Sequence, residues 1–74
     1  MLTVSIGKRN QLVMKNLQNQ IGKKLQMKKT FSNHKGSLLE NEKVTLILVN
    51  EQNQELKVTD PFGIDWIIPF YYIE

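Results

Sequence analysis

Apolar residues follow two different spacings along the chain, and the spacing changes near Gly22. Before Gly22, an apolar stripe at steps of three and four residues predicts an amphipathic helix. The stripe consists of Val13 or Met14, Leu17 and Ile21. Asn10 has the side chain of an N-cap, and glycine is the residue type that commonly follows the last turn of a helix. We therefore predict a helical segment over residues 10–22, preceded by an arm or a short strand over residues 1–9.

After Gly22 the pattern becomes that of short β-strands. Alternating or β-branched runs occupy residues 25–31, 37–39, 44–49, 56–59 and 66–73. Turn-forming residues separate these runs, at residues 32–36, 50–54 and 60–63. Pro69 lacks a backbone N–H, so the last run belongs at the edge of a sheet or at a bend.

So many short strands in so short a chain favour a barrel, because closing the sheet removes unpaired edges and buries alternate side chains. We predict one domain over residues 1–74, mainly β with one N-terminal helix. Residues 23–74 are expected to form a small five-stranded barrel.

Charge is divided unequally between the two parts of the chain. Residues 1–36 hold eight basic residues and no acidic one, whereas residues 37–74 hold two lysines and seven acidic residues. The formal charges are thus +8 and −5. This asymmetry predicts a surface that faces a polyanion, or electrostatic self-assembly. Because the chain has no cysteine and hence no disulfide, we expect a homo-oligomer or a complex with a partner protein.

Four sequence runs, once placed in order, resemble the Sm-like barrel family, to which Hfq belongs. They are Ile21-Gly22-Lys23-Lys24-Leu25, Lys35-Gly36-Ser37-Leu38-Leu39, Val44-Thr45-Leu46-Ile47-Leu48 and Ile67-Ile68-Pro69-Phe70-Tyr71-Tyr72-Ile73. The departures concern the RNA pocket. Glu40-Asn41-Glu42-Lys43 stands where the family has an Asp and an Asn, and Ile68-Pro69-Phe70-Tyr71 lacks the Arg-Gly or Tyr-Lys-His signature. The resemblance implies the fold, and no RNA-binding residue is carried over from it.

A second resemblance is to the end of an SH3 domain, in which a Pro and a Tyr line a groove for proline-rich peptides. It rests on Gly63, on Trp66-Ile67-Ile68-Pro69 and on Tyr72-Ile73-Glu74. The acidic loop and the Ala-Leu-Tyr-Asp-Tyr-like opening of that family are missing, and the preceding helix is foreign to it. The SH3-like barrel is therefore the second choice.

The sequence offers no set of residues that could act together in catalysis. His34 is the single imidazole and lies in a turn, so no nucleophile, base and orienting group can be assembled around it. Asp60 and Asp65 flank a turn without the spacing of an EF-hand. We predict that the chain is not an enzyme and binds no metal and no cofactor.

The aromatic C-terminal segment is the first candidate site. Trp66, Phe70, Tyr71 and Tyr72 lie within seven residues, among isoleucines. Side chains of a strand point alternately to opposite faces, so one core cannot take all of them unless Pro69 bends the segment. Trp and Tyr are enriched among the residues that dominate protein interfaces. We therefore predict a protein-binding surface at these four residues, with burial in the core as the competing interpretation.

The basic residues of the first half are the alternative site. A nucleic-acid surface would draw on Lys23, Lys24, Lys28, Lys29 and Lys35. The competing interpretation is a solvated lysine face. Only Phe31 interrupts the basic run as an aromatic residue, so stacking with bases has little support from the sequence.

The function favoured by these patterns is a non-enzymatic protein-interaction module or assembly subunit that binds through the C-terminal aromatic segment. The alternative is an Hfq-like nucleic-acid-binding protein that uses the basic N-terminal half. Residues 66–73 form the longest nearly apolar run, too short for a membrane span, so we expect a cytoplasmic protein with no membrane partner. Abundant Lys, Asn and Gln with little Ala is typical of an AT-rich bacterial or phage genome.

Overall fold

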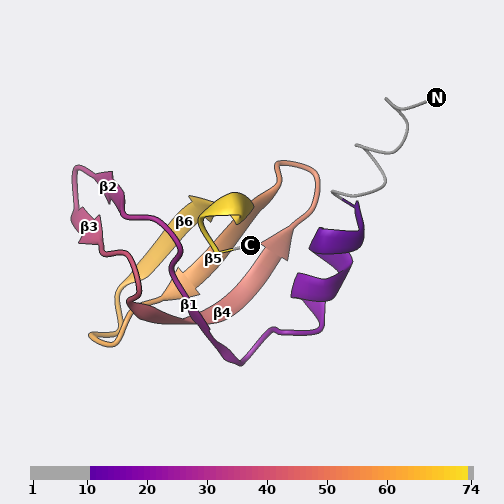
Figure 1. Ribbon diagram of the computed structural model, residues 1–74, viewed down its shortest axis with the longest axis horizontal. Helices are drawn as coiled ribbons and strands as arrows, with labels where there is room; N and C mark the ends of the chain where they lie inside the picture. Colours follow the sequence, from indigo (N-terminus) through magenta and orange to yellow (C-terminus); the bar gives the residue numbers. More distant parts are fainter. Residues whose placement is uncertain (1–10, 74) are drawn as a thin grey trace.

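A computed structural model describes residues 11–73 of the chain (Figure 1). The predicted arm or strand over residues 1–9 and the predicted N-cap, Asn10, lie outside the described residues. The described chain begins in a helix that ends at residue 18, followed by turns over residues 19–22.

The helix packs on the sheet through Met14 and Leu17, which are both buried. It ends before the predicted residue 22, because the N–H groups of Asn19 and Gln20 bond to carbonyls three residues back and tighten the last turn. Ile21 therefore leaves the apolar stripe and is 42% exposed. Gly22 has φ +91° and donates its N–H to the carbonyl of Leu46 at 2.7 Å, which fixes the end of the turn on the sheet.

Six strands follow the helix. They are β1 (Lys24–Gln26), β2 (Phe31–Asn33), β3 (Gly36–Leu38), β4 (Lys43–Asn50), β5 (Glu55–Thr59) and β6 (Asp65–Pro69). A 3-10 helix, η1 (Phe70–Tyr72), ends the described chain. Strands β1, β4, β5 and β6 form one antiparallel sheet in the order β1-β4-β5-β6, and β2 and β3 form a separate hairpin. In Figure 1 the hairpin and the helix lie at opposite ends of the four-stranded sheet.

The mainly β chain with one helix is confirmed, whereas the closed five-stranded barrel is not. Two breaks explain the difference within residues 11–73. The predicted strand over 25–31 divides after β1, because Met27 is the last residue that bonds toward β4 and the next residue, Lys28, bonds to η1 instead. The last run bends at Pro69, as the sequence predicts, and continues as η1 rather than as a strand. One backbone bond links η1 to the segment after β1, from the Lys28 N–H to the carbonyl of Tyr72 at 2.8 Å.

A β-bulge at Ile47 changes which side of β4 faces the core. Leu46 lies opposite Val58, and Leu48, two residues later, lies opposite Lys57, only one residue earlier in β5. Because one extra residue reverses the alternation, Leu46 is buried and Leu48 points outward. The buried apolar residues form one core: Met14, Leu17, Met27, Leu38, Val44, Leu46, Val49, Leu56, Val58, Trp66, Ile68 and Ile73.

Candidate protein-binding surface

The backbone of η1 is fixed at both ends, which sets the positions of its aromatic side chains. Pro69 is extended, with φ −62° and ψ 146°, and turns the chain out of β6. The Phe70 N–H donates to the carbonyl of Gln54 at 3.1 Å, and the Tyr72 carbonyl accepts from Lys28. Ile73, buried in the core, anchors the far end. The aromatic residues of η1 are therefore presented on an ordered segment.

Four aromatic rings form a continuous row on this segment and the neighbouring hairpin. Phe70 meets Tyr71 edge to face at 5.7 Å, Tyr71 lies tilted against Tyr72 at 5.3 Å, and Tyr72 meets Phe31 edge to face at 5.3 Å. Tyr71 is 50% exposed, and the other three rings are partly buried. We call Phe31, Phe70, Tyr71 and Tyr72, together with Lys29, the aromatic surface.

Lys29 belongs to this surface because its ammonium group lies close to both tyrosine rings. Nζ is 5.3 Å from the centroid of Tyr71 and 5.9 Å from that of Tyr72. At such distances a cation is attracted by the negative face of an aromatic ring. One member of the predicted basic set and two members of the predicted aromatic set thus share one location.

Trp66 lies in the core, where its ring meets Phe31 of the aromatic surface edge to face at 6.4 Å. It is 3% exposed, and its indole N–H donates to Oδ2 of Asp60 at 3.0 Å. The reason is the alternation of β6, which turns Trp66 and Ile68 inward. The competing interpretation, burial in the core, therefore describes Trp66, and Trp66 has little surface to offer a partner.

Asp60 is the buried carboxylate that organises the loop between β5 and β6. Its Oδ1 accepts the backbone N–H groups of Phe62 and Ile64, each at 2.9 Å, while Oδ2 accepts from Trp66. Burial alone would raise the pKa of Asp60. The hydrogen bonds from Ile64, Trp66 and Phe62 stabilise the charged form more strongly, so its pKa lies below the ordinary value. The sequence predicted only a turn at Asp60, and the structure shows that its carboxylate holds the loop together.

The remaining predicted basic residues do not gather in one place. Lys35 lies over the Trp66 ring, with Nζ 5.0 Å from its centroid, and donates to the carbonyl of Asp65 at 2.6 Å. Lys24 lines a hollow of about 90 Å³ with Lys43, beside Asp60. Lys23 lies in the turn before β1, and Lys28 is joined to Tyr72 through its backbone.

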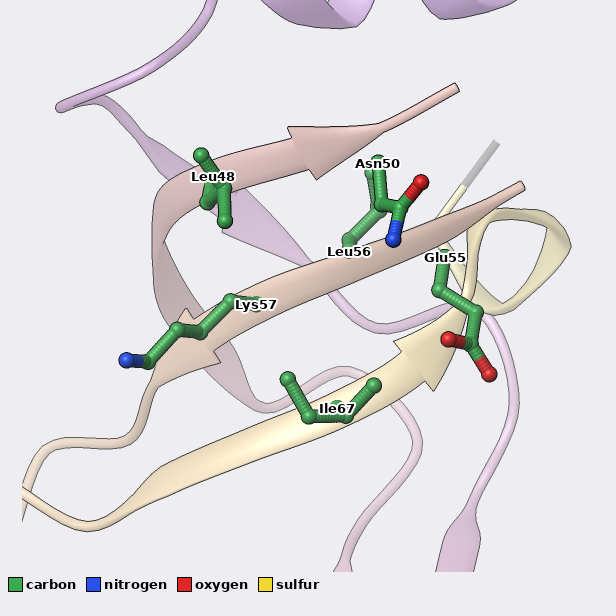
Figure 2. A pocket seen from close by; sticks show the side chains of 6 residues that line it. All are labelled: Leu48, Asn50, Glu55, Leu56, Lys57 and Ile67. Atoms are coloured by element: carbon green, nitrogen blue, oxygen red, sulfur yellow. The ribbon is translucent and has the colours of Figure 1, made fainter. Parts of the chain in front are cut away.

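A second hollow, of about 240 Å³, lies on the outer face of β4, β5 and β6 (Figure 2). Sequence reasoning missed it. Its walls are Leu48 and Ile67, which are 55% and 52% exposed. The signal in the sequence is the unbroken apolar run Leu46-Ile47-Leu48-Val49, in which not every side chain of a strand can face inward.

Other chemistry is limited in the described part of the chain. Within residues 11–73, no group of three or more His, Cys, Asp or Glu side chains is placed to hold a metal ion. His34 is exposed in the turn between β2 and β3. Among the helices of this same region, none has the length and apolar character needed to cross a membrane.

Comparison with protein-family models, with curated proteins and with solved structures found no match to this chain. The Sm-like and SH3-like resemblances accordingly stay predictions. The function is argued below from the geometry of the aromatic surface.

Proposed function

We propose that this chain is a non-enzymatic protein-interaction module or assembly subunit that binds its partner through the aromatic surface. The observation that carries the proposal is Tyr71, a half-exposed ring between two other rings on a segment whose backbone is fixed. Rigid aromatic side chains lose little conformational entropy when they are buried by a partner. Phe70 and Tyr72 extend the contact, and Trp66 packs against Phe31 from the core.

The small-barrel architecture is part of this proposal. Two features support it: the backbone bond between Lys28 and Tyr72, and the paired bonds of Met27 with Glu42 and Asn41. The first joins the C-terminal segment to the chain just after β1, as closure of a barrel requires, and the second extends the pairing of β1 with β4 by one residue. Pro69 and Tyr72 are both partly exposed, which agrees with the groove residues that the SH3-like resemblance implies.

Nucleic-acid binding is the second candidate, and the placement of Lys29 favours it. An ammonium group beside two neighbouring tyrosine rings combines phosphate attraction with an aromatic surface on which bases can stack. Lys28 directly precedes Lys29, whereas the other three lysines lie in the bend before β1, in β1 and in the turn of the hairpin. Because a long phosphate backbone needs many contacts at once, we rank this function below protein binding.

The experiment that tests the first function is capture of proteins from a nuclease-treated bacterial extract on the immobilised chain. Three baits are compared: the wild type, Tyr71→Ser and Phe62→Ser. Phe62 is the matched control, because it is 85% exposed on the loop after β5 and lies outside the aromatic surface. We expect at least one protein recovered by the wild type and Phe62→Ser but not by Tyr71→Ser. Equal recovery on all three baits contradicts the proposal.

The second function is tested with a single-stranded 20-nucleotide DNA and the RNA of the same sequence. Fluorescence anisotropy at about 50 and 200 mM salt measures both affinity and its salt dependence. Nucleic-acid binding predicts a Kd that rises by orders of magnitude over this range and a large loss in Lys29→Gln. Protein binding through the aromatic surface predicts weak binding of both the DNA and the RNA. A cytoplasmic location and the absence of enzymatic activity stay predictions of the proposal.

A further inference from the structure

The outer face of the four-stranded sheet carries two rows of side chains in register. Lys57 of β5 lies between Leu48 of β4 and Ile67 of β6. The second row is Glu55, between Asn50 and Pro69. Figure 2 shows side chains of both rows around the 240 Å³ hollow, whose lining also includes Leu56.

The central residues of the two rows carry opposite charges. One has a cation flanked by two apolar side chains, and the other has an anion flanked by Asn50 and Pro69. Two copies of the chain can stack with these outer faces toward each other. A two-fold axis midway between the two sheets, perpendicular to the strands, then places the first row of one copy opposite the second row of its partner. A symmetric interface of this kind repeats each contact twice. Lys57 of each copy then faces Glu55 of the other, Ile67 faces Pro69, and Leu48 faces Asn50.

We propose that this sheet face is a homodimer interface, in which a second copy of the chain covers the hollow with its strands antiparallel. The exposed apolar pair, Leu48 and Ile67, supplies the area to be buried, and the reciprocal Lys57–Glu55 contacts set the orientation. Lys57 is held only weakly in the monomer, by Asp65 at 3.7 Å with both side chains about half exposed. Leu48, Lys57, Glu55 and Ile67 take no part in the proposed function, so the inference does not rest on it.

Charge reversal tests this arrangement because each single variant meets itself across the two-fold axis. In Glu55→Lys both reciprocal contacts become Lys–Lys, and in Lys57→Glu both become Glu–Glu. The double variant restores opposite charges. An equimolar mixture of the two single variants restores them as well, but only in the mixed dimer. The loss of the Lys57–Asp65 contact is common to the Lys57→Glu single variant, the double variant and the mixture, so it cannot produce the recovery.

Sedimentation equilibrium of the full chain, up to about 1 mM, measures the dimer Kd. Glu40→Lys and Lys43→Glu are matched controls that change the net charge equally at exposed positions outside both rows. Near-ultraviolet circular dichroism of Trp66 shows that each variant is folded. Leu48→Ser and Ile67→Ser test the apolar part independently of charge.

We expect a wild-type dimer, a Kd at least about tenfold higher in each single reversal, and a return toward the wild-type Kd in the double variant and in the mixture. The two controls should stay close to the wild type, and the two serine variants should be mainly monomeric. A wild-type monomer at about 1 mM overturns the inference. Single reversals that behave like their controls, or a mixture no tighter than its components, overturn it equally.

Discussion

The indole N–H of Trp66 donates to a carboxylate oxygen of Asp60 at 3.0 Å, and this bond joins the β5–β6 loop to the core. The same carboxylate accepts the N–H groups of Phe62 and Ile64. One buried side chain therefore satisfies three donors at the point where β6 begins. Since β6 leads directly into η1, this network also supports the aromatic surface.

Replacing Asp60 by Ala should lower the free energy of unfolding by about 2–3 kcal/mol, because buried donors lose their acceptor. Asp60→Asn should cost less, since the amide oxygen still accepts from the loop. Urea unfolding followed by Trp66 fluorescence measures both variants. Glu40→Ala is the control, at an exposed position, and should stay close to the wild type. Equal stability of Asp60→Ala and the wild type would show that the loop does not need the carboxylate.

The depressed pKa of Asp60 predicts a loss of stability in acid. The folded pKa lies below the unfolded value of about 4, so the stabilisation is complete above about pH 4 and is lost as the pH falls through the folded pKa. We therefore expect the stability difference between the wild type and Asp60→Asn to be constant from about pH 7 to 5 and to shrink below about pH 4. Urea midpoints measured across this range test the prediction. A difference that grows in acid would mean that the sign of the pKa shift is wrong.

Gly22→Ala should destabilise the chain by about 1–2 kcal/mol through the backbone alone. The residue has φ +91°, and nothing lies within 4 Å of the place that a Cβ would occupy. The penalty is therefore conformational rather than steric. Gly22→Asn should cost less than Gly22→Ala, because Asn tolerates the left-handed region better. Thermal unfolding by circular dichroism compares the two, and an unchanged midpoint in Gly22→Ala would contradict the backbone assignment.

Truncation of Trp66 should lower the free energy of unfolding much more than truncation of Tyr71. Trp66→Ala removes a large core side chain and should cost about 3–5 kcal/mol, whereas Tyr71→Ser should change stability by no more than about 1 kcal/mol. Urea unfolding followed by far-ultraviolet circular dichroism measures both without relying on the tryptophan signal. A large loss of stability in Tyr71→Ser would make Tyr71 a structural residue and remove it from the proposed interface.

The local elements could be predicted from the sequence where a single pattern decides them. The turn over residues 50–54 joins β4 and β5, and Pro69 ends a strand at the edge of the sheet. Both outcomes depend on residue types with strong backbone preferences. Whether the sheet closes into a barrel could not be decided in this way, because closure depends on how the segment after β1 and η1 meet rather than on either segment alone.

The candidate site, too, could be predicted from the sequence only in part. Alternation places Trp66 and Ile68 on one side of β6, but the residues do not say which side faces the core. The aromatic residues of η1 follow no alternation, because a 3-10 helix has three residues per turn. The bulge at Ile47, which turns Leu48 outward, requires knowledge of the register with β5. The pairing of Lys29 with Tyr71 also joins segments about forty residues apart and has no local signal.

The central claim is tested most directly by the Kd of a purified partner recovered by capture, measured by calorimetry for the wild type, Tyr71→Ser and Lys29→Gln at about 50 and 200 mM salt. A desolvated aromatic anchor contributes about 2 kcal/mol or more, so Tyr71→Ser should raise the Kd by about 30-fold or more at both salt concentrations. An exposed lysine contributes about 0–1 kcal/mol, so Lys29→Gln should raise the Kd by no more than about fivefold. The opposite order, with a small effect of Tyr71→Ser and a large, salt-sensitive effect of Lys29→Gln, would contradict binding through the aromatic surface.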